Sequence, residues 1–261
     1  MPIEHISFTQ LNMFLRCGEQ YRRRYIDGKI IPPSGSLVRG KCCHHAISVN
    51  MTQKIKSKQD LALEQIKDAF ADEWESTKYQ IAWNEDELDG QSPKKVEGQY
   101  KDAGIALTEI FHIEQCPNCQ PIKVEDEFLI KFEGGYLPLL GYIDRIDADD
   151  ILAEQKFVSK SPPKNEIENA VQVTAYDLGF RAKYGKKPTW LWMQWAIATK
   201  QPKTVLQSCR PREDDVINRF LFRLEAFMSA LERGVFLPAS NDAWVCSPKW
   251  CGYYQSCKFR K

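Results

Sequence analysis

The sequence predicts an α/β fold in which a central mixed β-sheet is flanked by helices, with a helical N-terminal region and a cysteine-rich C-terminal segment. Two observations lead to this fold class. Residues 122–197 follow the order strand, strand, strand, helix, strand, and apolar residues recur with helical spacing on both sides of that region. With 261 residues and 43% hydrophobic side chains, the chain can bury a sizeable core. We expect one domain over residues 1–261, comprising a helical insertion at about 50–120, a sheet core at about 121–200 and a C-terminal helix and cysteine segment at 213–261.

The N-terminal part is predicted to be mainly helical. Residues 7–10 (Ser-Phe-Thr-Gln) have the pattern of a capping box, and the helix that follows should end near Gly18. A second helix should begin near Leu37. Residues 59–115 are acidic with helical spacing, and a polar stretch at 84–95 should interrupt them.

The predicted sheet begins near residue 122. Its elements are expected to be, in order, a strand at 124–132, its hairpin partner at 137–146, a strand at 151–158, a helix at 166–184 and a strand at 190–197. Apolar residues between 216 and 231 then follow a 3.6-residue period and predict a final helix.

The charge of the chain is unevenly distributed. Its formal net charge is +1, but residues 1–60 carry +6, residues 61–155 carry −14, residues 156–245 carry +5 and residues 246–261 carry +4. This pattern is consistent with a basic groove around a carboxylate-rich site, and equally with a long solvated acidic helix between ordinary segments.

Two features exclude a membrane protein. The longest stretches without Asp, Glu, Lys or Arg, 42–53 and 188–199, have twelve residues each, whereas a spanning helix needs roughly eighteen or more. The first ten residues lack the apolar region of a signal peptide. We therefore expect a soluble, cytoplasmic protein without a membrane partner. Nine cysteines without an export signal favour metal or iron–sulfur ligation over a disulfide framework.

The segment from Asp144 to Lys156 holds the most informative side chains. Because side chains alternate along a strand, Glu154 and Lys156 should point to the same face. Carboxylates hold Mg²⁺ or Mn²⁺, and a neighbouring lysine can position or help deprotonate a metal-bound water during phosphodiester hydrolysis. Taken alone, however, a Glu-x-Lys pair is also common on the exposed face of an ordinary strand.

Four motifs in order resemble the PD-(D/E)XK nuclease superfamily, and most closely its RecB-like branch, which includes the CRISPR-adaptation exonucleases and many phage exonucleases. They are Gly40-x-x-x-His44, Gly141-Tyr-Ile-Asp144-Arg, Glu154-x-Lys156 and Gln172-x-x-x-Tyr176. The resemblance implies a restriction-endonuclease-like core. It assigns the metal to His44, Asp144, Glu154 and the backbone carbonyl of Gln155, and catalysis to Asp144, Glu154, Lys156, Gln172 and Tyr176.

Ordinary structural roles would also account for these residues one by one. His44 is compatible with a simple helix position, and Gln172 and Tyr176 share a face in any amphipathic helix because they are four residues apart. The sequence has Glu154 where Asp is commoner in the superfamily, and both occur there.

Cysteines at both ends of the chain extend the resemblance. In the iron–sulfur subset of the RecB-like nucleases, one cysteine ends the first helix and three lie near the C-terminus. The matching residues are Cys17, Cys246, Cys251 and Cys257, and the resemblance implies that they hold a [4Fe–4S] cluster. Zinc remains the alternative, since it also binds four thiolates. The gap from Cys246 to Cys251 is wider than the family's usual spacing, and Gly18 stands where the family often has proline.

The remaining cysteines are less informative. Cys116-Pro-Asn-Cys119 forms a C-x2-C half-site without a second pair at zinc-ribbon distance, and we leave its role open. Cys42, Cys43 and Cys209 are expected to be structural thiols.

Together these features predict a metal-dependent DNA nuclease that uses Mg²⁺ or Mn²⁺, and more specifically an exonuclease in phage or bacterial recombination, repair or DNA processing. Its partner would be single-stranded DNA or DNA ends, with Arg22, Arg23, Arg24 and the basic residues of 258–261 on the phosphates. The alternative is a non-catalytic DNA-binding module stabilised by an iron–sulfur cluster or zinc. A nucleotide-dependent helicase or ligase has no support, because the sequence has no G-x-x-x-x-G-K-[ST] loop.

Overall fold

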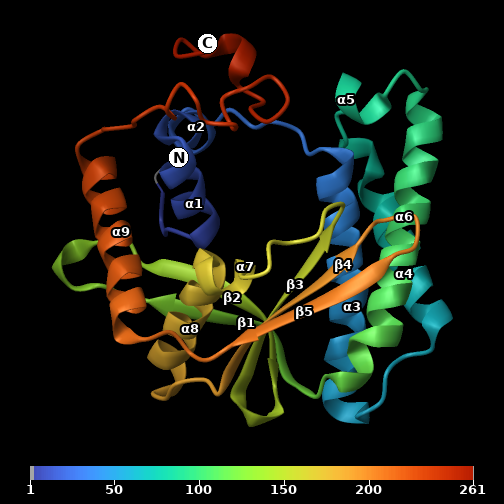
Figure 1. Ribbon diagram of the computed structural model, residues 1–261. Coiled ribbons are helices and arrows are strands. Elements are labelled where there is room, and N and C mark those ends of the chain that lie inside the picture. Colours follow the sequence, from blue (N-terminus) through green and yellow to red (C-terminus); the bar gives the residue numbers. More distant parts are fainter. Residues whose placement is uncertain (1–2, 261) are drawn as a thin grey trace.

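The computed structural model describes residues 3–260 (Figure 1). Met1, Pro2 and Lys261, the last of which belongs to the predicted basic C-terminal segment, lie outside the described residues. Within 3–260, five strands form one sheet in the order β1-β2-β3-β4-β5. The strands are β1 (Pro121–Ile130), β2 (Leu139–Asp147), β3 (Ile151–Val158), β4 (Trp190–Ile197) and β5 (Lys203–Cys209). Only β3 and β4 are parallel, so the sheet is mixed, as predicted.

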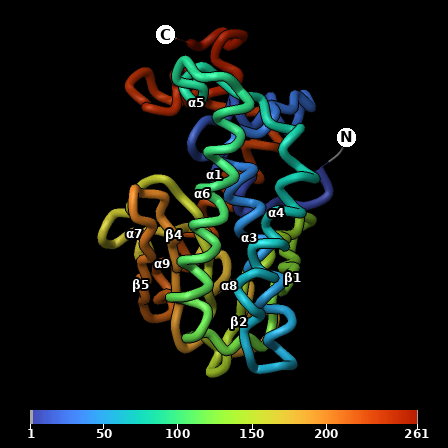
Figure 2. Tube along the Cα trace, turned by 90° about the vertical axis from the view of Figure 1, so that its right-hand side faces the viewer, coloured from blue at the N-terminus to red at the C-terminus, as the bar shows by residue number. Residues whose placement is uncertain are grey.

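Helices cover both faces of this sheet (Figures 1 and 2). The α-helices are α1 (Phe8–Arg16), α2 (Gly18–Tyr21), α3 (Gly35–Ser57), α4 (Leu63–Thr77), α5 (Glu85–Leu88), α6 (Pro93–Glu114), α7 (Glu166–Asn169), α8 (Val171–Tyr184) and α9 (Asp214–Glu232). Short helical turns are the π-helix η1 (Arg22–Ile26) and the 3-10 turns η2 (Lys78–Gln80), η3 (Cys116–Asn118), η4 (Glu133–Gly135), η5 (Ala148–Asp150) and η6 (Tyr254–Ser256). None of the helices in the described part of the chain is long and apolar enough to cross a membrane.

The helices pack against the sheet through two apolar cores. The first lies between one face of the sheet and α1, α8 and α9, and it contains Phe180, Trp195 and Phe227. The second lies under α3, α4 and α6, and it includes Phe157 and Ala196 from the opposite face of the sheet. Trp195 and Ala196 are neighbours in β4 and enter different cores, as the alternation of side chains along a strand requires.

The structure corrects three local predictions. Strand β5 was not expected; it is an edge strand that pairs only with β4, and half-exposed and exposed residues fill it, so its apolar signal is weak. The single helix expected at 166–184 is two helices, because Ala170 has an extended backbone (φ −67°, ψ 105°). The predicted capping box is only half formed. Ser7 Oγ accepts from the backbone amide of Gln10, but the Gln10 side chain donates to the His5 carbonyl instead of accepting from the Ser7 amide.

The C-terminal segment after α9 packs against the N-terminal helices α1 and α2 (Figure 1). The Gly18 amide donates to the Leu237 carbonyl at 2.7 Å. A Cβ atom at residue 18 would lie 2.7 Å from the Leu237 nitrogen, so the close approach requires glycine here.

Candidate active site

Asp144 and Glu154 lie where strands β2 and β3 diverge. Pairing between the two strands ends at Arg145 and Ala153, just before both carboxylates. The Gln155 amide, two residues further along β3, donates to Asp144 Oδ2 at 2.9 Å. The end of strand pairing therefore frees a backbone donor that fixes one of the two carboxylates beside the other.

Lys156 and two side chains of α8 complete a connected network around Glu154. Lys156 Nζ forms an ion pair with Glu154 Oε1 and donates to Gln172 Oε1 at 2.8 Å. The Gln172 amide donates to Glu154 Oε2 at 2.8 Å. The hydroxyl of Tyr176 lies 2.8 Å from Asp144 Oδ1 and 2.6 Å from Glu154 Oε2. The five residues assigned to catalysis by resemblance are thus brought together at one point.

His44 reaches this point from α3, on the other side of the two strands. Its Nε2 lies 3.1 Å from Asp144 Oδ2, and its Nδ1 lies 3.9 Å from Glu125 Oε1. Glu125 was not predicted to belong to the site. The pairs Val124–Arg145 and Asp126–Ile143 place it opposite Asp144, and its left-handed backbone (φ 50°) is unusual for a glutamate. Within the acidic run 125–127, no sequence signal separates Glu125 from its neighbours.

Burial and like charge shape the electrostatics of the two carboxylates. Burial, and after it the neighbouring charge of Asp144, raise the pKa of Glu154 to about 7. Burial also opposes ionisation of Asp144, but the hydrogen bond and charge of His44 outweigh it and lower the pKa of Asp144. The same pairing raises the pKa of His44 despite the effect of burial.

These donors fit a divalent cation. The side chains of Asp144 and Glu154 are 13% and 3% exposed, so two carboxylates share a site largely removed from water. Two carboxylates this close and this buried repel each other when both are ionised. A hard ion with oxygen ligands would supply the missing positive charge, and His44 would add one nitrogen.

The four cysteines assigned to a cluster also converge. Cys17, Cys246, Cys251 and Cys257 line one cavity between α2 and the C-terminal segment, and all four are free thiols. The Ala239 amide donates to Cys17 Sγ at 3.3 Å. Residues more than 220 positions apart in the sequence thus surround a single space.

Polar contacts dock the C-terminal segment onto the N-terminal helices. The guanidinium of Arg23 donates to Ser256 Oγ at 2.8 Å and to the Ser256 carbonyl at 2.9 Å, next to Cys257. The Tyr253 hydroxyl donates to the Lys29 carbonyl at 2.7 Å. The pKa of Glu19 is lowered to about 2, mainly by the hydrogen bond from Arg22. Glu19 Oε1 in turn accepts from Arg23 Nε at 2.8 Å and so helps to position Arg23.

The three arginines predicted to bind DNA therefore differ from one another. Arg23 is buried and bonded to Glu19 and Ser256, so a phosphate contact from Arg23 does not fit its environment. Arg22 is paired with Glu19 and Asp27 and is partly exposed. Arg24 is half-buried in η1. The sequence pattern could not distinguish these three because Arg23 is bonded to Ser256, which lies 233 residues away in the sequence.

The remaining cysteines lie in the protein interior or near it. Cys43 is fully buried and donates to the Gly104 carbonyl at 3.5 Å, and Cys42 lies 3.5 Å from the Thr77 hydroxyl. Cys209 is half-buried beside Arg212. Cys116 and Cys119 are fully buried at the junction between α6 and β1.

Comparisons with known proteins identify the family of the chain. The family model for the PD-(D/E)XK nuclease superfamily matches residues 5–258. A solved structure from Eubacterium rectale, described as a candidate exonuclease, is similar to this chain with a TM-score of 0.60 and 10% identity, over 99% of this chain and 90% of that one. The structure of a protein named SSO0001 gives a TM-score of 0.46 and 14% identity, over 100% of this chain and 89% of that one. Among curated proteins, no significant match is found. Because the family model spans nearly the whole sequence, the chain belongs to the PD-(D/E)XK nuclease superfamily.

Proposed function

We propose that this protein is a metal-dependent DNA nuclease, and specifically an exonuclease of the RecB-like branch. The observation that carries the proposal is the convergence of Asp144, Glu154 and Lys156 where β2 and β3 diverge, with Gln172 and Tyr176 bonded to them. A surface Glu-x-Lys pair would not need two buried carboxylates and a network of this kind.

Asp144, Glu154, His44 and the Gln155 carbonyl would hold Mg²⁺ or Mn²⁺. The ion would lower the pKa of a bound water and neutralise charge on the scissile phosphate. Asp144 is suited to this role because the Gln155 amide fixes its orientation at 2.9 Å. Glu125 would orient His44, in the way that carboxylates beyond the metal ligands commonly orient a ligating imidazole.

Lys156 would position the attacking water and stabilise negative charge on the phosphate. Its ammonium is held between Glu154 and Gln172, yet its side chain is 35% exposed, so it is accessible to substrate. Gln172 contacts both Lys156 and Glu154 and would keep their spacing fixed. Tyr176 bridges the two carboxylates through its hydroxyl and would fix their relative orientation.

The C-terminal segment would carry the second cofactor. Cys17, Cys246, Cys251 and Cys257 line one cavity, which supports a [4Fe–4S] cluster that closes a loop of almost the whole chain. Zinc is the alternative occupant. The chemistry of four thiols fits either group, and metal analysis of anaerobically purified protein distinguishes them.

DNA is the expected substrate, as single strands or duplex ends. The basic N-terminal and C-terminal segments would contact phosphates, with Arg24, Lys258 and Arg260 as the residues to test. Exonuclease action is supported by the fold that the chain shares with the Eubacterium rectale protein described as a candidate exonuclease. A role in phage or bacterial recombination, repair or DNA processing would follow from this activity.

A direct assay tests the proposal. Anaerobically purified protein is incubated with Mn²⁺ and DNA labelled at either the 5′ or the 3′ end, single-stranded or duplex. We expect progressive shortening from an end that depends on the metal and is lost in Glu154→Gln. DNA binding without metal-dependent cleavage would contradict the proposal and would favour the non-catalytic DNA-binding module.

A further inference from the structure

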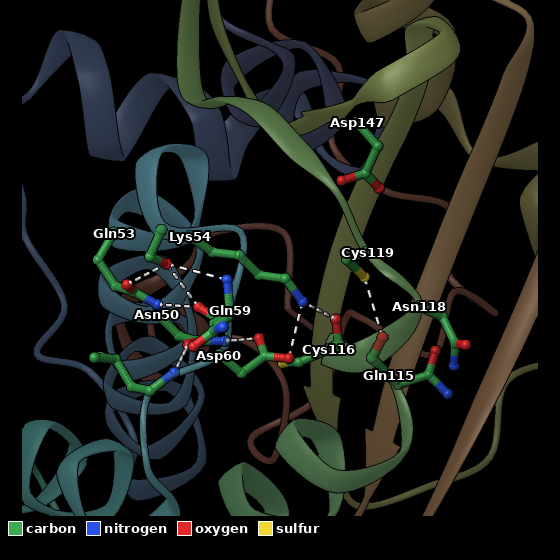
Figure 3. A network of polar contacts seen from close by, with 12 residues as sticks. Asn50, Gln53, Lys54, Gln59, Asp60, Gln115, Cys116, Asn118, Cys119 and Asp147 are labelled. Atoms are coloured by element: carbon green, nitrogen blue, oxygen red, sulfur yellow. Dashed lines mark hydrogen bonds and ion pairs between the residues drawn. The ribbon is translucent and has the colours of Figure 1, made fainter.

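Away from the active site, three side chains of metal-ligating types, Asp60, His112 and Cys116, lie close together. Figure 3 shows the polar network around two of them, Asp60 and Cys116. Asp60 lies between α3 and α4, His112 is in the last turn of α6 and Cys116 begins the turn η3. One ligand atom from each residue lies within 4.8 Å of the other two. Three donors from separate positions therefore face a common point.

The carboxylate of Asp60 is held firmly in place. Its Oδ1 accepts from Asn50 Nδ2 at 2.8 Å and its Oδ2 accepts from Lys54 Nζ at 2.8 Å (Figure 3). Each carboxylate oxygen keeps a further lone pair, so these hydrogen bonds orient the carboxylate and leave it able to bind a metal. Lys54 also donates to the Cys116 carbonyl at 2.7 Å. The hydrogen bonds of the Lys54 ammonium go to the Asp60 carboxylate and the Cys116 carbonyl, rather than to the His112 imidazole or the Cys116 thiol.

His112 contributes an unpartnered nitrogen. The residue is only 9% exposed, and among the described residues its Nδ1 has no hydrogen-bond partner. A buried nitrogen without a partner is costly, and native proteins rarely retain one without a reason. Because Nδ1 is buried without a hydrogen-bond partner, the imidazole can offer a lone pair there, which is how a neutral ring binds a metal.

We propose that Asp60, His112 and Cys116 bind one zinc ion, with water in the remaining position. A mixed set of one oxygen, one nitrogen and one sulfur donor suits Zn²⁺ and does not suit Mg²⁺ or Ca²⁺. Bonds of about 2.0–2.3 Å would draw the donors slightly closer than their present separation. Asp60 is partly exposed and gives the ion and the water a route to the site.

Such an ion would join three segments of the second core. It would tie the connection between α3 and α4 to the end of α6 and to the turn that leads into β1. It would also account for half of the C-x2-C motif. Cys119 Sγ donates to the Gln115 carbonyl at 3.1 Å and lies 3.7 Å from Gln194 Nε2, so Cys119 has a separate role in the network beside Arg145 and Asp147.

Zinc analysis of the full-length protein tests this proposal. The protein is saturated with zinc, passed over a desalting column and examined for zinc per chain and for the zinc X-ray absorption spectrum. Beyond any zinc held by the four cysteines or by the site around Glu154, we expect about one further zinc per chain whose first shell contains one sulfur and otherwise nitrogen or oxygen. Absence of this further zinc, or a spectrum with sulfur ligands alone, would overturn the proposal.

Matched variants sharpen the result. His112→Gln and Cys116→Ser should each lose this zinc, whereas Cys209→Ser and Cys119→Ser should keep it. Retention of zinc with the same spectrum in His112→Gln and Cys116→Ser would also overturn the proposal. The spectrum of the wild-type protein is measured without any substitution, so its result stands even if a variant fails to fold. The outcome is independent of nuclease activity, because none of the three residues belongs to the site around Glu154.

Discussion

The carboxylate–lysine site and the four-cysteine cavity are assembled in opposite ways. At the first, five of the interacting side chains come from a segment of the chain between Asp144 and Tyr176, and only His44 and Glu125 are added from elsewhere. At the second, Cys17 at the end of α1 meets cysteines from the last residues of the chain. The carboxylate–lysine site therefore depends mainly on neighbouring segments of the chain. The four-cysteine cavity depends on contact between segments near its two ends.

This difference predicts a division of roles. The side chains around Glu154 lie among strands whose packing is provided by two apolar cores, so their loss should affect chemistry more than folding. The cysteine cavity lies outside those cores and is held by polar contacts such as Arg23 to Ser256. Loss of a ligand there should affect stability more than chemistry.

The largest expected effect is on turnover. Lys156→Ala should lower the cleavage rate by roughly 10²–10⁴-fold, because a group that positions water and stabilises the transition state contributes mainly to the rate. Single-turnover cleavage of end-labelled DNA with Mn²⁺ measures it. Lys160→Ala, an exposed lysine just after β3, is the matched control and should cleave normally. Wild-type cleavage by folded Lys156→Ala would remove Lys156 from the site.

The next effect is on stability. Cys17→Ser and Cys257→Ser should cost the same amount, about 5 kcal/mol from the loop-closure entropy of a cross-link over about 240 residues. Anaerobic denaturant unfolding measures this cost. Cys209→Ser should cost far less, since Cys209 is a half-buried single thiol. Unequal losses at Cys17 and Cys257 would argue against one shared cluster.

The sequence predicted the parts of the molecule that depend on strong periodicity and spacing. The order of the first four strands and the positions of α1, α3 and α9 are confirmed, because their apolar patterns are unambiguous. Edge strand β5 was missed because half of its side chains face solvent. Glu125 was missed because cross-strand pairing places it opposite Asp144, and that pairing is not visible in a run of acidic residues. The burial of Arg23 depends on contact with Ser256, which lies 233 residues away.

A pH-dependent effect should be seen in metal affinity. Burial and the charge of Asp144 raise the pKa of Glu154 to about 7 in the metal-free protein, so the carboxylate is protonated below that pH and ionised above it. Mn²⁺ binds ionised Glu154 and neutral His44, whose pKa is also raised, so its affinity should fall as the pH drops through about 7, by up to about tenfold per pH unit for each proton displaced. Calorimetry from pH 5.5 to 8.5 measures this. Glu154→Gln should bind weakly with a flatter profile; an equally steep profile would assign the titration to another group.

The smallest expected effect separates two neighbouring arginines. Arg24→Gln should reduce the slope of log affinity for DNA against log salt concentration by about one, as loss of a phosphate contact does. Arg23→Gln should leave that slope unchanged and should instead loosen the segment around Ser256, which iron release under a chelator would detect. An unchanged slope in Arg24→Gln would mean that this basic run lies away from the DNA.

The division between the two sites is tested most directly by single-turnover cleavage with Mn²⁺ at low temperature, expressed per folded molecule, for Lys156→Ala and Cys17→Ser side by side. We predict that Lys156→Ala retains its iron and cleaves at least 10²-fold more slowly than wild type. Folded Cys17→Ser should lose iron and cleave within a few-fold of wild type. A loss of the chemical step in folded Cys17→Ser as large as that in Lys156→Ala would contradict the account.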